Sequence, residues 1–229
     1  MKRVNVGRMQ DVAILEMDRP SAKNAMDTPM LNALIDALLA VSTDTGFNAV
    51  VITGAGGTFS AGADIAEVVD PQGAVARMRR FAQLYELVVG FPKPVVAAIS
   101  GHCVGGGAEV ATACDLRVAD KTAKIRFPGA AFGIPVGTAR LPLLVGLSHA
   151  KDLLMTTRTV EAEEAFRLGL FNRLVDAPDL LTDSATIASE IAANPGAMVQ
   201  KRSLDAASGL ASRTGSENRS LRRWQKDQS

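Results

Sequence analysis

The sequence predicts an α/β fold, and three patterns in its 229 residues indicate this class. Short continuous apolar runs at 49–53 and 94–100 are typical of strands buried on both faces of a parallel sheet. Stretches with apolar residues at helical spacing, at 30–44 and 74–90, precede these runs. The end of the chain is helical and increasingly polar. Together the patterns predict an α/β core over 1–176 and a helical segment over 177–229.

The expected elements alternate along the chain. Residues 3–17 alternate between apolar and polar side chains and pause at Gln10-Asp11, which predicts a hairpin that ends before Pro20. The glycine-rich segments at 54–68 and 101–116 each read as a loop that runs into a helix. The remaining expected elements are short strands at 115–120, 123–127 and 171–176, with helical patterning from 147 onward.

Composition narrows the class of function. Lys and Arg number 25 against 24 Asp and Glu, so no basic face for nucleic acid is expected. Two cysteines and two histidines in no ligand-like cluster argue against a metal site and a disulfide framework, which favours a reducing cytoplasm. Charges interrupt the N-terminus and no apolar run is long enough for a membrane span, so we expect a cytoplasmic protein without a membrane partner.

The two glycine-rich turns, at 61–65 and 105–109, could bind a phosphate, a dinucleotide or a developing oxyanion. No GxxxxGK[ST] string for a phosphate loop occurs, and the string from Gly54 lacks the third glycine of a dinucleotide fingerprint. Two helix N-termini aimed at one point could instead hold a developing oxyanion with backbone N–H groups. Parallel neighbouring strands would bring both turns to one sheet edge. Spacing alone does not separate this interpretation from glycines that only allow close packing.

Two segments that contain these turns resemble a known family. FSAGADI (59–65) and GHCVGGGAEVATACDLRVA (101–119) are similar to the signature segments of the enoyl-CoA hydratase/isomerase family, the crotonases. The similarity continues in order through 18–26, 132–141 and 162–175. The resemblance implies a spiral of ββα units with C-terminal helices, an acyl-CoA thioester substrate, no further cofactor, and a homotrimer or hexamer.

The resemblance also implies roles for single residues. The N–H groups of Ala63 and Gly106 should hold the thioester oxygen, and Glu109, one helical turn after Gly106, should be the catalytic base. Asp64 should mainly support its turn, and Arg140 should be structural. Contacts to CoA are expected near Ala22, Lys23, Asn24, Ala61, Asp64 and Ile65.

One position departs from the hydratase pattern. Gly129 stands where the family has a second glutamate, so hydration should be slow, and Gly129→Glu should raise it if the rest of the pocket is hydratase-like. Isomerisation needs a single base, and we slightly prefer it. Other enolate reactions, such as decarboxylation or thioester hydrolysis, stay open, as does a non-catalytic acyl-CoA binding protein. The segment 177–229, expected to cover the pocket or to join subunits, is shorter than usual, which leaves acyl length and assembly open.

Overall fold

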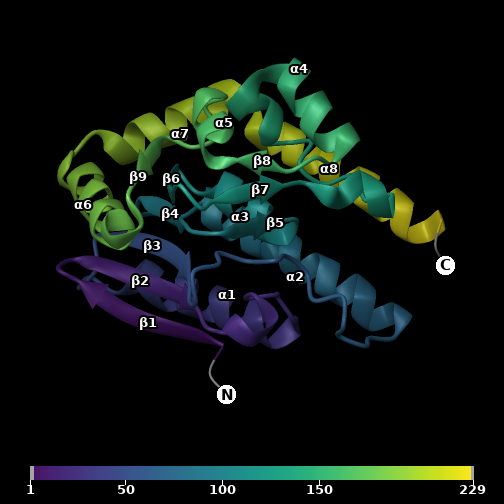
Figure 1. The fold of residues 1–229 in the computed structure, drawn as a ribbon, viewed down its shortest axis with the longest axis horizontal. Coiled ribbons are helices and arrows are strands. Elements are labelled where there is room, and N and C mark those ends of the chain that lie inside the picture. The colour runs from purple at the N-terminus through teal and green to yellow at the C-terminus, as the bar shows by residue number, and fades with distance from the viewer. Residues whose placement is uncertain (1–2, 228–229) are drawn as a thin grey trace.

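A computed structural model describes the backbone of residues 3–227 and the side chains of residues 3–220 (Figure 1). Its main sheet has six strands in the order β1-β2-β3-β4-β6-β9. β1 is antiparallel to β2, and every other neighbouring pair is parallel. The strands are β1 Val4–Met9, β2 Val12–Met17, β3 Ala49–Gly54, β4 Val95–Ile99, β6 Leu116–Asp120 and β9 Arg173–Val175.

A second, smaller sheet holds the glycine-rich turn at 105. It consists of β5 His102–Val104, β7 Lys124–Arg126 and β8 Val160–Glu161, with β7 in the middle. Gly105 N donates to Arg126 O at 2.9 Å, and Val104 N donates to Ser60 O at 2.9 Å. The sheet therefore ties the segment before Gly105 to the segment that follows β3.

Eight α-helices complete the described chain. Two of the long ones begin with an aspartate cap and a proline, which pre-organise the first turn. Asp27 accepts from Met30 N, and Asp70 accepts from Gly73 N. The helices are α1 Thr28–Thr43, α2 Pro71–Val89, α3 Gly106–Ala113, α4 Leu141–Thr156, α5 Ala162–Arg167, α6 Leu180–Ala193, α7 Ala197–Ser208 and α8 Leu210–Asp227.

The parallel strands are buried on both faces, which explains their continuous apolar runs. On one face Val51 and Val96 pack with Ala188 of α6. On the other face Ile52 and Ala97 belong to the large core, which also takes in α1, α2 and α3. Alternate residues of each strand thus serve two separate cores.

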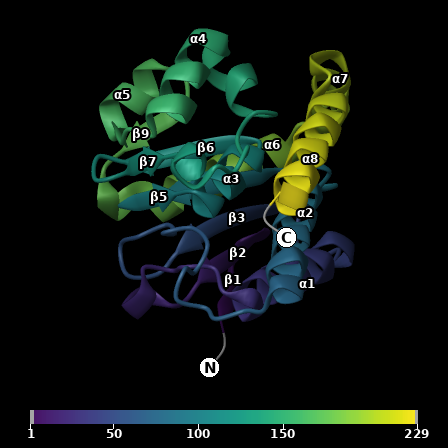
Figure 2. The same ribbon diagram turned by 90° about the vertical axis from the view of Figure 1, so that its right-hand side faces the viewer.

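The last helices, α7 and α8, return to the side of the molecule where α2 lies. Figure 2 shows α7 and α8, drawn in yellow, on the same side as α2. Asn218 Nδ2 of α8 donates to Glu86 Oε1 of α2 at 3.0 Å, so the two helices are in direct contact. This return brings side chains of the polar C-terminal segment next to the central elements.

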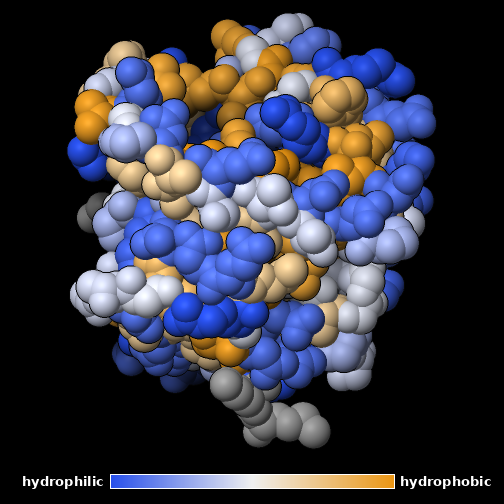
Figure 3. Space-filling model, turned by 90° about the vertical axis from the view of Figure 1, so that its left-hand side faces the viewer, coloured by the Kyte–Doolittle hydropathy of each residue, from blue (hydrophilic) through white to orange (hydrophobic). Residues whose placement is uncertain are grey.

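Exposed apolar side chains gather on the later helices. On the face shown in Figure 3 they are more frequent in the upper half than in the lower half. Several of the large ones belong to α4, α5 and α7, namely Leu143, Leu147, Met155, Phe166, Val199 and Leu204. None of the helices in the described part of the chain combines the length and apolarity of a membrane span.

The structure confirms most expected elements and corrects two. The hairpin, the parallel pairing of β3 with β4 and the helix after the triple glycine are present. The helix expected directly after Asp64 is absent, because Asp64 Oδ1 closes a turn on Ala66 N and Asp70 caps a helix that begins only at Pro71. Helix α4 also has a first part at 141–145 that the pattern did not indicate, and Gly146, with φ 75°, separates it from the helical run expected from 147.

Candidate active site

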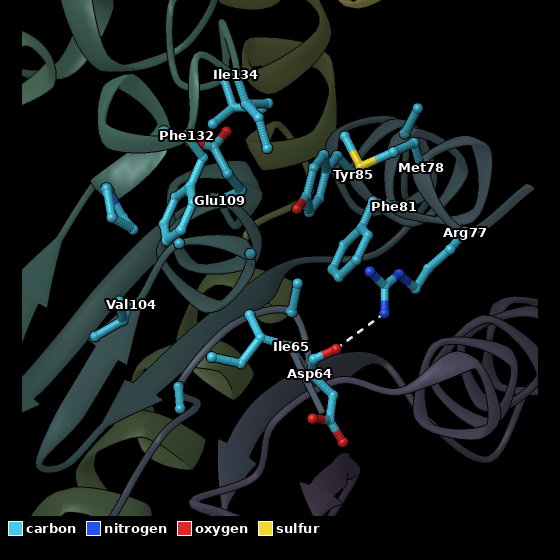
Figure 4. Close-up of a pocket in the computed structure, with 18 of the residues that line it drawn as sticks. Asp64, Ile65, Arg77, Met78, Phe81, Tyr85, Val104, Glu109, Phe132 and Ile134 are labelled. Atoms are coloured by element: carbon cyan, nitrogen blue, oxygen red, sulfur yellow. Dashed lines mark hydrogen bonds between the residues drawn. The ribbon is translucent and has the colours of Figure 1, made fainter. Parts of the chain in front are cut away.

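A cavity of about 760 Å³ lies where the two glycine-rich turns, α2, α8 and the loop before α4 meet. Most of its wall is apolar, and Figure 4 shows Phe81, Phe132 and Ile134 around it. Such a space suits an apolar chain, and the few polar groups in its wall define where chemistry can occur.

The two turns touch each other at the cavity. Gly62 has φ 91°, and a Cβ there would lie 2.6 Å from Val104 O and 3.1 Å from Gly106 N. A Cβ on Gly106 would lie 2.7 Å from the ring of Phe81. Side chains at these positions would therefore push the turns apart or fill the cavity.

Two residues at this junction have a backbone N–H group without a backbone acceptor in the part of the chain that the structure describes. Ala63 and Gly106 both line the cavity. Among the hydrogen bonds of the described residues, neither N–H has a backbone acceptor, whereas Asp64 N donates to Met26 O at 3.0 Å. Only the Gly106 group begins a helix, because the turn at Ala63 runs into irregular chain. The site thus differs from the expected pair of helix N-termini, but it offers two donors.

Glu109 lies one helical turn after Gly106 and is 1% exposed. Its Oε2 accepts from Arg140 Nη2, while its Oε1 has no hydrogen-bond partner among the described residues. Burial raises the pKa of Glu109 to about 7, with Arg140 opposing the rise and Glu217 adding to it. The carboxyl group can therefore exchange a proton near neutral pH.

Arg140 and Glu217 join Glu109 in this buried group. Arg140 is 4% exposed, and its guanidinium carbon lies 5.2 Å from the centroid of the Tyr85 ring. Glu217, on α8, accepts from Gly137 N at 3.1 Å and from Ala139 N at 2.7 Å. The ion pair of Arg140 with Glu109 is compatible with the structural role expected for Arg140. Glu217 was missed, and no local pattern in its polar helix marks it.

Asp64 has a different environment from Glu109. Its Oδ2 accepts from Arg19 Nη1 at 2.5 Å and its Oδ1 accepts from Ala66 N at 2.9 Å. The hydrogen bond from Arg19 lowers the pKa of Asp64. In Figure 4 its side chain points away from Glu109, and its backbone oxygen accepts from Arg77. These contacts match the expected support of the turn.

The residues expected around CoA divide into two groups. Ala22, Ala61 and Ile65 line the cavity together with Asp64, and Ile65 is 90% exposed at its mouth. Lys23 and Asn24 are outside the wall. Asn24 is fully buried, and its amide nitrogen donates to Ala55 O and Thr58 O, so its side chain stabilises the turn and has no donor left for a ligand.

Gly129 lines the cavity, but its surroundings leave no room for a longer side chain. A Cβ there would lie 2.6 Å from Ile134 O and 2.7 Å from Val136 Cγ2. The loop has therefore closed over the place where the family resemblance puts a second glutamate. A Gly129→Glu side chain must therefore displace Ile134 or Val136, and the gain in hydration, which was expected only if the rest of the pocket is hydratase-like, stays a prediction.

Comparisons with known proteins point to one family. The family model described as enoyl-CoA hydratase/isomerase matches residues 7–222. A crotonyl-CoA hydratase of Syntrophomonas wolfei is 40% identical over 190 residues, which covers 80% of this chain and 72% of that relative. A probable enoyl-CoA hydratase of Mycobacterium bovis is 36% identical over 202 residues, covering 86% and 79%.

Solved structures of enoyl-CoA hydratases and isomerases also superpose on this chain. An enoyl-CoA hydratase/isomerase from Xanthobacter autotrophicus superposes with a TM-score of 0.87 at 30% identity, covering 96% of this chain and 85% of that one. A monofunctional enoyl-CoA isomerase from M. smegmatis has a TM-score of 0.78 at 30% identity, covering 92% and 95%. These similarities confirm the expected crotonase-like α/β fold with C-terminal helices.

Proposed function

This chain belongs to the enoyl-CoA hydratase/isomerase family of acyl-CoA enzymes, and we propose that it shifts the double bond of an enoyl-CoA with Glu109 as its base. The main support is the unpartnered Oε1 of Glu109, a buried carboxylate oxygen beside an apolar cavity. The N–H groups of Ala63 and Gly106 would hold the thioester oxygen. The thioester oxygen would then have two N–H donors in the cavity wall, and the transferred proton would have a carboxylate there.

The proposed reaction moves one proton. The Glu109 carboxylate takes a proton from C2 of a 3-enoyl-CoA, and the electron pair of that C–H bond spreads over the thioester as a dienolate. Two N–H donors at the thioester oxygen stabilise this charge. Glu109 then returns the proton to C4, so the double bond lies between C2 and C3. Atoms and charge balance without a water molecule or any cofactor beyond CoA.

The environment of Glu109 suits this exchange. A base that must both take and return a proton works best with a pKa near the working pH. Burial alone would keep the group protonated, and Arg140 offsets part of that effect, so the pKa comes to about 7. Both protonation states of Glu109 are then accessible at neutral pH.

Hydration is the second candidate, favoured by the names of the relatives, most of which are hydratases. It needs a second group that activates water. The wall near Gly129 is formed by Phe132, Ile134 and Val136, which offer apolar side chains. The wall holds two other acids: Asp64 is paired with Arg19, and both oxygens of Glu217 already accept backbone N–H groups. The wall therefore favours isomerisation over hydration.

The CoA part would enter over the exposed Ile65, with Ala22 and Ala61 beside it and Lys23 next in the chain. Assembly into a homotrimer or hexamer belongs to the same proposal. The exposed Leu143, Leu147 and Met155 on α4 offer an apolar surface for it.

Proton exchange tests the base without presuming the overall reaction. Saturated and unsaturated acyl-CoAs are incubated with the protein in D₂O, deuterium is followed by mass spectrometry, and conjugation of a 3-enoyl-CoA by ultraviolet absorbance. Exchange and isomerisation should be lost in Glu109→Gln and kept in the control Glu190→Gln, an exposed glutamate of α6. Undiminished exchange in Glu109→Gln would refute the assignment, and rapid hydration of crotonyl-CoA would favour the second candidate.

A further inference from the structure

Glu217 is a buried glutamate in an otherwise mostly polar helix, and it is 6% exposed. Both of its carboxylate oxygens accept backbone N–H groups, from Gly137 at 3.1 Å and Ala139 at 2.7 Å. These groups precede α4, whose N-cap residue, Arg140, makes no side-chain cap. Glu217 therefore supplies the negative charge and the acceptors that a helix N-terminus favours, from a distant part of the chain.

The turn that Glu217 holds also encloses Glu109. A Cβ on Gly137, where φ is 81°, would lie 3.0 Å from Glu109 Oε1. Arg140 directly follows the turn and donates to Glu109 Oε2. Both oxygens of Glu109 thus face the short segment whose backbone is bound by Glu217.

We propose that Glu217 is a positioning residue: by binding the turn from Gly137 to Ala139, it places Arg140 against Glu109, so that the seating of α8 controls the reactivity of the base. The catalytic part of this proposal rests on the proposed role of Glu109. The contact spans 80 residues in sequence for Gly137 and 78 for Ala139, so it forms only when α8 is packed.

The charged and titratable groups around Glu109 come from several elements. Arg140 precedes α4, Glu217 is on α8, Tyr85 is on α2 and Cys103 is on β5. Burial raises the pKa of Tyr85 and of Cys103 well above their ordinary values, so both stay neutral near pH 7. The charge balance at Glu109 is therefore governed by one cation, Arg140, and one further anion, Glu217.

Glu217 itself is poorly placed to transfer protons. Each of its oxygens already accepts a backbone N–H, from Gly137 and from Ala139, so neither oxygen is free to take a substrate proton. Glu109, in contrast, keeps an unpartnered oxygen. The two buried glutamates therefore have different tasks: one carries the proton and the other holds the turn.

Direct titration of Glu109 tests the coupling independently of activity. The full chain is labelled with ¹³C at glutamate Cδ, and the Glu109 signal is assigned by its loss in Glu109→Gln. In Glu217→Gln, which has nearly the same shape without the charge, the pKa of Glu109 should fall and the acid limb of the kcat/KM profile should move to lower pH. Glu190→Gln is the exposed control and should change neither.

Glu217→Ala also removes both acceptors, so the turn should loosen. Its kcat should fall about tenfold to a hundredfold with a smaller change in KM, because a misplaced group slows the reaction more than it weakens binding. Glu217→Gln, which keeps one acceptor, should recover part of that loss. Thermal unfolding of each variant checks that the fold is retained.

Two outcomes would overturn the proposal. One is an unchanged titration of Glu109 in a folded Glu217→Gln protein. The other is loss of turnover in Glu217→Gln as complete as in Glu109→Gln, which would make Glu217 a proton-transfer group. If Glu109→Gln keeps full proton exchange, the proposed function fails, while the titration still decides whether Glu217 and Glu109 are coupled.

Discussion

The two glycine-rich turns look alike in sequence, and each is followed by an acid, yet the fold gives the two acids opposite environments. Asp64 follows Gly62 and Ala63, forms an ion pair with Arg19 at 2.5 Å, and has a lowered pKa. Glu109 follows the triple glycine, is 1% exposed, and has a pKa raised to about 7. Similar local motifs thus provide an ionised support on one side of the cavity and a titratable group on the other.

The difference arises from what packs on each turn. The Asp64 turn lies at the cavity mouth, where exposed chain follows it and Arg19 is within reach. The Glu109 turn lies under α2, α4 and α8, which remove water and leave Arg140 as its ion-pair partner. Desolvation raises the pKa of a carboxyl group, and an unopposed ion pair lowers it. Packing therefore decides which carboxyl group has the raised pKa and which the lowered one.

Replacing each acid by its amide should give the largest difference between the two turns, because one variant should lose activity and the other stability. Glu109→Gln should lower kcat by about 10²–10⁴, the usual contribution of a general base. Asp64→Asn should keep most of the turnover and instead lower the free energy of unfolding by about 1–3 kcal/mol, because it leaves Arg19 without its closest partner. Steady-state kinetics and urea unfolding measure the two effects. Equal losses of kcat would show that Asp64 also takes part in the reaction.

Replacing one glycine of each turn by alanine should give a smaller difference, which concerns the free energy of unfolding. In Gly62→Ala the new Cβ meets a rigid backbone oxygen, Val104 O at 2.6 Å, and the residue must keep φ 91°. In Gly106→Ala the nearest atoms belong to the side chains of Phe81 and Met26, which can move. Gly106→Ala should cost about 1–3 kcal/mol of unfolding free energy, and Gly62→Ala should cost more. Denaturant unfolding ranks the two, and the reverse order would contradict the packing of the turns.

The pH dependence of stability should differ in sign between the two acids. Glu109 binds a proton more tightly in the folded protein, so its contribution to stability declines as pH rises from its ordinary pKa of 4.5 through about 7. Asp64 contributes above its ordinary pKa of 3.8, and that contribution is lost as pH falls through its lowered folded pKa. Unfolding measured across pH should show the first slope removed in Glu109→Gln and the second in Asp64→Asn. Identical profiles for wild type and variants would refute the assigned shifts.

Much of the site could be predicted because its signals are local. The strands, the two turns and Glu109 one helical turn after Gly106 all depend on residues near one another in sequence. The helix expected after Asp64 failed because a side-chain turn and a later cap compete with it. The side-chain contacts of Asn24 could not be predicted for a related reason, since its amide donates to the backbone of residues 55 and 58, while its expected place near CoA stays a prediction.

By itself, the sequence determined the class of fold, the order of the elements and the identity of the acid nearest the triple glycine, because backbone sterics and periodicity act over a few residues. Only the tertiary structure decided that Arg140 pairs with Glu109, that Glu217 holds the turn before α4, and that the loop at Ile134 closes over Gly129. The physical reason is that desolvation and ion pairing depend on distances between segments far apart in the chain.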